Sequence, residues 1–356
     1  MKTYGWLGLS LLVVSGYFLS RRIEPFTAWF YCFAWWSYIL LADNLLLKLR
    51  GRSLLVSRRR EFWGMLPISV FIWLLFEAYN FVINNWSYDA VPPQTWLRWP
   101  GYALAFSTVL PGIFITSDLV ELVFGRSTRP AASEYEPIEE PRPAPSPLFI
   151  VVGLLLTAAP LVLPTYFFAA VWLGPIFFLD PLLEKFGIRS LSLSIHSGER
   201  TRVWSLMLGG FICGLIWEFW NFWAGAKWIY SVPFFDRPKI FEMPLLGFLG
   251  FPPFALECWI LYHLVRAVPR RMVSSAARIA WWMALAALSL AVLRGIDRHT
   301  VLRFAAVVTD KADSCKNLVA FAVPDDKLQD VSYSNRGGSE YFGVSGMSRF
   351  PALFFD

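Results

Sequence analysis

The feature that most constrains this chain is a series of apolar blocks, each about as long as a bilayer-crossing helix. About 20 residues at ~1.5 Å per residue span a hydrocarbon core of ~30 Å. Eight blocks run over residues 4–20, 26–47, 62–83, 101–124, 148–163, 166–183, 203–224 and 245–265. Because a backbone in lipid must satisfy its own hydrogen bonds, blocks of this kind predict helices. The sequence therefore predicts an all-α integral membrane protein.

The composition supports this interpretation. Charged residues make up 16% of the chain, whereas soluble domains carry about a quarter. Aromatic residues make up 18%, with 18 Trp, and Trp and Tyr are enriched at membrane interfaces. The four cysteines form no CxxC pair and the three histidines are scattered. We therefore expect no disulfide framework, no metal and no other cofactor.

The two halves of the chain repeat each other. The motif "DNLLLKLRGRSLL" from Asp43 resembles "DPLLEKFGIRSLSL", which begins 137 residues later at Asp180. Further on the offset becomes 141, and the matching pairs are Trp63/Trp204, Glu77/Glu218, Asn80/Asn221, Phe81/Phe222, Val91/Val232, Pro92/Pro233 and Pro111/Pro252. This collinear series predicts two tandem four-helix repeats, residues 1–124 and 148–268. Each half has an even number of helices, which predicts parallel and not inverted repeats.

Three segments lie outside these repeats. Residues 125–147 are rich in Pro, Glu and Ser, and they predict an extended, protease-sensitive cytoplasmic linker. A ninth, short helix is expected over residues 279–293, with Arg278 and Arg294 reaching opposite interfaces. The tail, residues 297–356, contains the strand-like stretches "VLRFAAVV" and "NLVAFAVP". It predicts either a small extramembrane cap or a disordered tail.

The basic residues indicate the orientation. They cluster at residues 48–60, 185–202 and 266–271, which lie on one side if every block spans. The positive-inside rule then places these loops and the N-terminus in the cytoplasm of a multi-pass inner-membrane protein. The first block lacks an A-x-A cleavage site, which favours a retained helix over a signal peptide. The net charge of +6 is thus explained without a nucleic-acid partner, and the expected partners are membrane lipid and, as an open alternative, other membrane subunits.

Carboxylates inside the apolar blocks are the candidate functional groups. Charged side chains at the centre of a bilayer cost roughly 2.5–3.5 kcal/mol on insertion scales, so each one suggests a function. Glu218 lies within "GLIWEFWNFW", and Asn221 shares its helical face. Glu77 and Asn80 form the same pair in the first half. Interhelical hydrogen bonding is the alternative role, and we assign it first to Glu77 and Asn80.

The second half carries additional acids and a helix break. Glu242 lies before the eighth block, Glu257 lies within it, and Pro252 and Pro253 are expected to break or kink that helix. We predict that Glu218, Asn221 and Glu257 share one cavity and that two of these acids exchange a proton with a ligand. The predicted catalytic residues are Glu218, Glu257, Asn221 and Glu242, and the predicted substrate-binding residues are Trp217, Trp220, Trp228 and Tyr230. An aromatic belt at the membrane interface is the alternative role for Trp228 and Tyr230.

Part of this second half resembles the membrane-embedded lycopene cyclase domains of carotenoid synthesis. The resemblance rests on Glu218, Trp228, Tyr230, Glu242, Pro244, Phe254 and Glu257, over about 40 residues of each half. Leu245 and Leu246 stand where that family has two acids after its proline. The family's domains also occur as tandem pairs. The resemblance implies proton-initiated cyclisation or hydration of a polyene, without a metal or nucleotide.

Three function classes remain open from the sequence. The first is an intramembrane enzyme that acts on a lipophilic substrate, such as an isoprenoid, a carotenoid or a lipid, by acid–base chemistry. The second is a proton- or cation-coupled transporter, which a broken helix and buried acids would suit. The third is a structural subunit of a membrane complex. The chain has no GxSxG, HExxH, P-loop or GxGxxG motif, which disfavours a hydrolase for soluble substrates.

Overall fold

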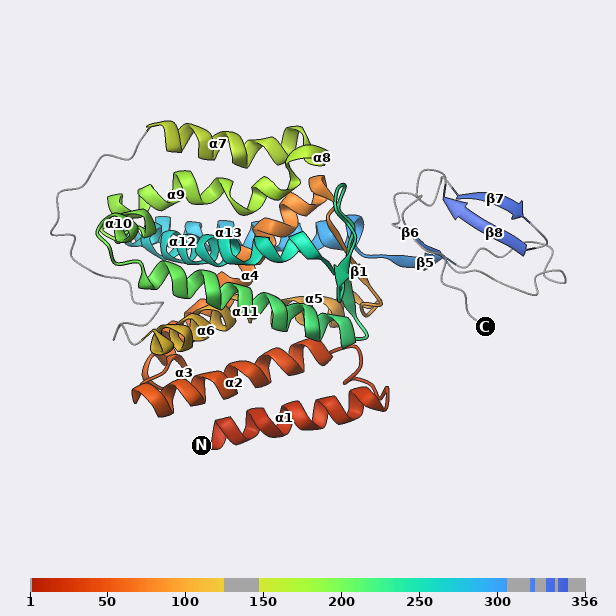
Figure 1. The fold of residues 1–356 in the computed structure, drawn as a ribbon, viewed down its shortest axis with the longest axis horizontal. Coiled ribbons are helices and arrows are strands. Elements are labelled where there is room, and N and C mark those ends of the chain that lie inside the picture. Colours follow the sequence, from red (N-terminus) through yellow and green to blue (C-terminus); the bar gives the residue numbers. More distant parts are fainter. Residues whose placement is uncertain (1, 125–146, 306–320, 324–330, 337–338, 345–356) are drawn as a thin grey trace.

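The computed structural model describes residues 2–124, 147–305, 321–323, 331–336 and 339–344. Within these residues, eight helical segments are long and apolar enough to cross a membrane. They lie roughly along the long axis of the molecule (Figure 1). This is the architecture of a multi-pass, mainly helical membrane protein. The linker predicted over residues 125–147 lies outside the described residues except for Pro147, which begins a helix.

The first half contains six helices and one short strand. In chain order they are α1 (Thr3–Ser20), α2 (Phe30–Arg50), α3 (Leu54–Ser57), α4 (Arg59–Ile83), β1 (Trp86–Asp89), α5 (Thr95–Phe106) and α6 (Val109–Val123).

The second half divides the predicted sixth span into shorter helices. Its elements are α7 (Pro147–Val162), α8 (Pro164–Phe167), η1 (Phe168–Trp172), α9 (Gly174–Lys185), α10 (Leu191–His196), α11 (Thr201–Trp223), β2 (Lys227–Tyr230), β3 (Lys239–Ile240), β4 (Met243–Pro244), η2 (Leu245–Gly250) and α12 (Phe251–Arg270). The last helix is α13 (Ser275–His299), and the short strands β5 (Arg303–Ala305), β6 (Phe321–Val323), β7 (Val331–Arg336) and β8 (Ser339–Val344) follow it.

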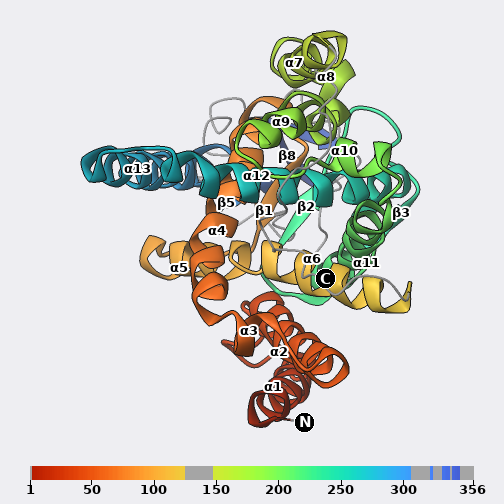
Figure 2. The same cartoon turned by 90° about the vertical axis from the view of Figure 1, so that its left-hand side faces the viewer.

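Four helices form the centre of the bundle. α11 packs against α6 and α12, and α4 packs against α6, α12 and α13. On the outside, α1 packs on α2 and α7 packs on α9, at opposite edges of the bundle in Figure 1. We call one end of the bundle the arginine end, where Arg50, Arg59, Arg202 and Arg270 lie, and the other the strand end, where β1 and β2 lie. Figure 2 shows the bundle after a quarter turn.

Three of the predicted spans are interrupted. The fourth is divided into α5 and α6 at Ser107 and Thr108, and the sixth into α8, η1 and α9. The eighth starts as the 3₁₀ helix η2 and becomes α-helical only at Phe251, so that Pro252 lies in the first turn of α12. Proline is tolerated there because the first backbone N–H groups of a helix have no intrahelical acceptor. Pro252 therefore marks the start of a helix and does not kink one.

The ninth helix is longer than predicted. α13 has 25 residues, and the Ser274 side chain accepts a hydrogen bond from the backbone N–H of Ala277 at its start. Arg278 and Arg294 lie inside this helix and do not mark its ends. Hydropathy alone missed both ends because helix formation does not require apolar residues. The length makes α13 one of the candidate membrane spans.

The two membrane halves meet through paired strands at the strand end. β1 and β2 are antiparallel, with Trp86 opposite Tyr230 and Tyr88 opposite Trp228. On the other side of β1, Tyr88 N–H donates to the Thr300 carbonyl at 2.7 Å, and Leu302 N–H donates to the Tyr88 carbonyl at 2.8 Å. The chain after α13 therefore adds to the edge of β1. In the tail, β5 pairs with β6 and β7 pairs with β8, so the described part of the two strand-like stretches is confirmed as extended.

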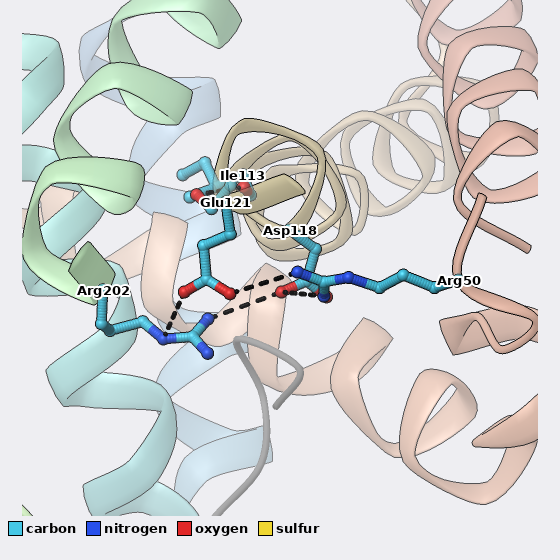
Figure 3. Close-up of polar contacts among 6 residues, drawn as sticks. Arg50, Ile113, Asp118, Glu121 and Arg202 are labelled. Atoms are coloured by element: carbon cyan, nitrogen blue, oxygen red, sulfur yellow. Dashed lines mark hydrogen bonds and ion pairs between the residues drawn. The ribbon is translucent and has the colours of Figure 1, made fainter. Parts of the chain in front are cut away.

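The arginine end is held by an ion cluster of two acids and two arginines. Asp118 and Glu121, one turn apart on α6, lie between Arg50 of α2 and Arg202 of α11 (Figure 3). Arg202 Nε is 3.0 Å from Glu121 Oε1, and Arg50 Nη2 is 3.4 Å from Glu121 Oε2. The side chains of both acids are almost fully buried. These arginines therefore join helices from both halves, in addition to lying in the basic clusters noted in the sequence.

A second buried ion pair joins α13 to α5. Arg98 Nε lies 2.7 Å from Asp297 Oδ1, and its Nη1 also donates to the carbonyls of Pro92 and Pro93. Trp99 Nε1 donates to the other oxygen of Asp297 at 2.8 Å. The Arg98 side chain is only 4% exposed. These contacts fix the end of α13 at the strand end of the bundle.

We predict that Arg98→Ala lowers the free energy of unfolding by about 3 kcal/mol, because it leaves the buried Asp297 without its cation. The detergent-solubilised protein is heated, and the folded fraction that remains at each temperature is measured by size-exclusion chromatography. Arg298→Ala is the matched control, since Arg298 is an exposed arginine on α13, next to Asp297. An equal loss in both variants would contradict the structural role of the ion pair.

Candidate functional site

Two asparagines form the turns that lead from α4 and α11 into the strands. Asn80 Oδ1 accepts from the backbone N–H groups of Asn85 and Trp86, and its Nδ2 donates to the Trp86 carbonyl at 2.8 Å. Asn221 does the same with Trp228, whose N–H donates to Oδ1 at 3.0 Å and whose carbonyl accepts from Nδ2 at 2.9 Å. Both asparagines are buried. Asn221 therefore has a structural role at the site, like Asn80.

Glu77 is tightly bound by hydrogen-bond donors. Its Oε1 accepts from the indole of Trp73 at 2.8 Å, the indole of Trp86 at 3.0 Å and the phenol of Tyr88 at 2.5 Å. The side chain is fully buried. The three donors come from α4 and β1, so that this carboxyl fixes the strand against the helix. Glu77 therefore has a structural role, but it joins α4 to a strand and not to another helix as the sequence suggested.

Glu218 occupies the same place relative to β2 but is less well satisfied. Its Oε1 accepts only from the Tyr230 phenol, at 2.9 Å, and the side chain is fully buried. Oε2 has no hydrogen-bond partner in either Glu218 or Glu77. The indole of Trp228 lies nearby and makes no hydrogen bond. Glu218 thus has one donor where Glu77 has three.

A glycine explains one of the two missing donors. Trp73, which donates to Glu77, stands four residues before it, and the residue four before Glu218 is Gly214. The ring of Phe251 lies on Gly214 so closely that a Cβ there would be 2.2 Å from Phe251 Cδ2. An aromatic carbon edge therefore replaces an N–H donor, and the surroundings of Glu218 are more apolar than those of Glu77.

The two tyrosines keep their protons. Burial, followed by the charge of the neighbouring carboxyl, raises the pKa of Tyr88 and of Tyr230 well above the usual value. Each phenol is therefore the donor in its bond to Glu77 or Glu218. At Tyr230 this places an O–H group between Glu218 and the interior space described next.

A cavity of about 510 Å³ lies beside Tyr230. Trp73, Trp172, Trp217, Trp228 and Phe254 form its inner wall. Their rings are in contact with one another: Trp73 lies 5.3 Å from Trp217, and Phe254 lies 5.5 Å from Trp172. Apart from the indole N–H groups, polar side chains in the lining come from Asn85, Tyr166 and Tyr230. The wall is thus suited to a mainly apolar ligand that makes few polar contacts.

The mouth of the cavity is apolar as well. Its lining includes Tyr166, Leu173, Phe235, Leu246 and Leu249, and between 44% and 73% of each of these residues is exposed. They belong to α8, the start of α9, the β2–β3 loop and η2. Leu173, Leu246 and Leu249 lie within two of the candidate membrane spans. In a bilayer this mouth would therefore face lipid at the strand end.

The predicted substrate-binding residues are divided between two places. Trp217, Trp228 and Tyr230 line the cavity. Trp220 does not, and it packs instead against α2, with ring centroids 5.1 Å from Trp35 and 5.9 Å from Tyr38. Trp217 and Trp220 lie one turn apart and both contact Trp35, but only Trp217 also reaches the cavity wall. The prediction that Trp220 lines the site is therefore not supported by the structure.

Glu242 lies at the strand end in an ion pair. Its Oε1 is 2.6 Å from Lys227 Nζ, and both side chains are partly exposed. It interacts electrostatically with Glu218 without touching it. The next two residues, Met243 and Pro244, line the cavity. Glu242 is thus beside the site and neutralised by Lys227, a weaker position for a catalytic group than the sequence suggested.

Glu257 is separate from Glu218. It is fully buried on α12, and neither of its carboxyl oxygens has a hydrogen-bond partner. Tyr79 of α4 and Cys258 interact with it electrostatically, whereas no interaction between Glu257 and Glu218 occurs in the described structure. Glu257 also does not line the cavity. The structure therefore does not bring the two acids into the shared site that we expected.

Several wall residues escaped the sequence analysis. Trp73 and Phe251 line the cavity, and Trp172 lines it as well and stacks on Phe76 at 5.1 Å. Phe254, which was named only for the family resemblance, is also part of this wall. On the other side of Trp73 and Trp217, a smaller cavity of about 80 Å³ is lined by Tyr88, Arg98 and Tyr102 among others. The cavity beside Glu218 is thus the roomier of the two.

Metal ligands and known relatives do not define this site. In the described part of the chain, no group of three or more His, Cys, Asp or Glu side chains could hold a metal ion. Comparison with known protein families, characterised proteins and solved structures finds no match to this chain. The chemistry must therefore be argued from the cavity and its carboxyl groups.

We predict that Glu77→Leu destabilises the protein more than Glu218→Leu. The first change leaves three buried donors without an acceptor and the second leaves one, and each costs about 1–3 kcal/mol. Thermal unfolding of both variants in the same detergent measures the difference. Because the two substitutions remove the same atoms, they control for each other, and equal losses would contradict the distinction between the two carboxyls.

Proposed function

We propose that this protein is an intramembrane enzyme that acts on a lipophilic substrate held in the cavity beside Tyr230. The single observation that carries the proposal is the arrangement of one buried carboxyl, Glu218, hydrogen-bonded to a phenol, Tyr230, that lines an aromatic cavity of about 510 Å³. Ligand sites in proteins usually measure ~300–1,000 Å³ and have mostly apolar walls with a few polar groups. The apolar mouth suits a substrate that enters from lipid.

The proposed chemistry is proton donation. Glu218 has a free carboxyl oxygen and no cation in direct contact among the described residues. In the proposed step Glu218 is protonated. The Tyr230 hydroxyl turns from Glu218 to the substrate, gives up its own proton and takes the Glu218 proton in its place. The proton adds to a carbon–carbon double bond of the substrate and leaves a carbocation. Loss of a proton from a neighbouring carbon to the same base restores the site, so the net reaction is an isomerisation.

The aromatic wall supports a cationic intermediate. The faces of Trp, Tyr and Phe rings attract a cation within about 6 Å, most strongly for Trp. Trp73, Trp172, Trp217 and Trp228 surround the cavity. This environment favours an isoprenoid or carotenoid-like polyene over other lipids, because only the polyene forms a delocalised cation on protonation. The resemblance of Glu218, Trp228, Tyr230 and Phe254 to lycopene cyclase domains favours the same class of substrate.

We also propose that the two halves are tandem, parallel repeats. Asp43 accepts from the Leu55 N–H, as Asp180 does from the N–H groups of Leu191 and Ser192. The Asn80 and Asn221 turns provide a second, independent agreement. The arginine end faces the cytoplasm of a bacterial-type inner membrane in this proposal, since positive residues collect there. The N-terminus of α1 then lies on the cytoplasmic side.

Proton- or cation-coupled transport is the second candidate. It is favoured by Glu257, a fully buried acid whose two oxygens have no hydrogen-bond partner. Carboxyl groups of this kind in membrane helices often carry protons. A role as a structural subunit is the third candidate, and it predicts that neither acid is needed for a chemical activity.

The test of the enzyme uses lycopene as the probe. Detergent-solubilised protein is mixed with lycopene in micelles, and products are separated by chromatography and identified by mass spectrometry. We expect a product of unchanged mass, because the proton that starts the reaction returns to the site. A product heavier by one water would show that water captures the carbocation instead. Glu218→Gln and Tyr230→Phe are expected to slow the conversion by about 100-fold or more, as loss of a general acid does.

The matched controls are Glu77→Gln and Tyr88→Phe, which alter the corresponding pair in the first half and are expected to convert lycopene at the rate set by their folded fraction. Conversion that persists in Tyr230→Phe would contradict the proposed proton path. Absence of conversion by the wild type, together with no lipophilic molecule extracted from the purified protein, would favour a structural subunit. Glu257-dependent acidification of proteoliposomes would favour transport.

A further inference from the structure

A crevice lies between α13 and the bundle at the arginine end. Its volume is about 340 Å³, and it is bounded by α4, α12 and α13. The lining contains four arginines, one acid, one Trp and small or apolar residues: Arg60, Glu61, Gly64, Ile68, Arg266, Pro269, Arg270, Arg278 and Trp282. It is remote from the cavity beside Tyr230, which lies at the strand end.

The crevice arises because α13 is buried against the bundle mainly at its strand end. The buried residues of α13 are Val292, Leu293 and Ile296, and Gly295 lies so close to α4 that a Cβ there would be 2.5 Å from the Phe81 ring. Toward the arginine end, by contrast, most side chains of α13 are exposed. Figure 2 shows α13 projecting from the side of the bundle.

The lining of the crevice also contains apolar residues. They include Trp282 of α13, which is 43% exposed, Ile68 of α4 and Pro269 of α12. Beside the crevice, Ile279 and Met283 of α13 and Trp63 of α4 are 60%, 65% and 66% exposed. All of these residues belong to candidate membrane spans. In a bilayer, apolar surfaces of this kind are covered by acyl chains, so lipid is the occupant that fits the walls.

The charge at the mouth of the crevice selects the headgroup. Glu61 is already paired, with Arg58 and with Arg266 Nη1 at 3.2 Å, and it accepts from the Tyr262 hydroxyl. Arg60 and Arg278 are exposed and add positive charge that this one acid does not balance. Arginine binds phosphate through paired, charge-assisted hydrogen bonds. Basic pockets between membrane helices on the cytoplasmic side bind anionic lipid headgroups.

We propose that this crevice is a binding site for one anionic phospholipid. The phosphate lies between Arg60 and Arg278, and the acyl chains lie along Trp282 and the facing surface of α4. The lipid fills the gap that the divergence of α13 from α4 leaves open. This site is independent of the proposed enzymatic function, because it shares no residue with the cavity beside Tyr230.

Native mass spectrometry and thermal unfolding test the proposal on the full-length protein. The probes are phosphatidylglycerol and, at equal concentration, phosphatidylcholine. We expect one tightly bound phosphatidylglycerol per chain and a rise in the unfolding temperature of about 2–4 °C or more, as ligand binding to the native state produces. Phosphatidylcholine is expected to give neither effect.

The double variant Arg60→Gln/Arg278→Gln is expected to weaken phosphatidylglycerol binding by about tenfold, since two charge-assisted contacts are lost. The matched control is Arg52→Gln/Arg59→Gln, which removes the same charge from exposed positions that do not line the crevice. Both arginines of the first variant are exposed, so unliganded stability should not change.

Three outcomes would overturn the proposal. Equal weakening in the control variant would show a general attraction to the basic surface. Equal stabilisation by glycerol 3-phosphate would show a site for a soluble phosphate and not for a lipid. Equal binding of phosphatidylcholine would show that the arginines do not select the headgroup.

Discussion

The constraint on which the rest of this structure depends is that backbone polar groups leaving a helix in apolar surroundings need new hydrogen-bond partners. α4 and α11 both end where the chain turns into a short strand, and the strands β1 and β2 satisfy each other. Asn80 and Asn221 satisfy the turns between helix and strand. Once the strands are fixed in this way, Trp86, Tyr88, Trp228 and Tyr230 are fixed as well. The cavity and both carboxyl pairs follow from this pairing.

The two carboxyl groups show how a small sequence difference can separate structure from chemistry. Glu77 and Glu218 face equivalent tyrosines, but Trp73 gives Glu77 an additional donor where the second half has Gly214. The glycine admits Phe251, and the start of α12 comes to lie against α11. Glu218 is left with a single donor, Tyr230, and that tyrosine lines the aromatic cavity. Satisfied polar groups stabilise a fold, whereas incompletely satisfied ones are available to a ligand.

Much of the architecture could be predicted from the sequence, and the failures have physical causes. The apolar blocks identified the membrane class, and the spacing of Glu218 and Asn221 identified the helix face that meets β2. The direction of Trp220 and the isolation of Glu257 could not be predicted, because they depend on which neighbouring helix each side chain meets. The cavity could not be predicted because its wall combines residues of α4, η1, α11 and α12. These elements are far apart in the sequence, and no periodic pattern of residues links them. The full length of α13 escaped prediction because its arginine-bearing ends are helical without being apolar.

The register of β1 and β2 has a consequence for how such a chain could arise. Trp86 faces Tyr230 and Tyr88 faces Trp228, so the first aromatic residue of each W-x-Y stretch lies opposite the second of the other. Each strand therefore makes the same contacts to the other. Contacts of this kind are called isologous, and they are the property of an interface with twofold symmetry. A single half carrying one such strand is thus already complementary to a copy of itself. The present contact between the two halves has the form of a dimer interface contained within one polypeptide.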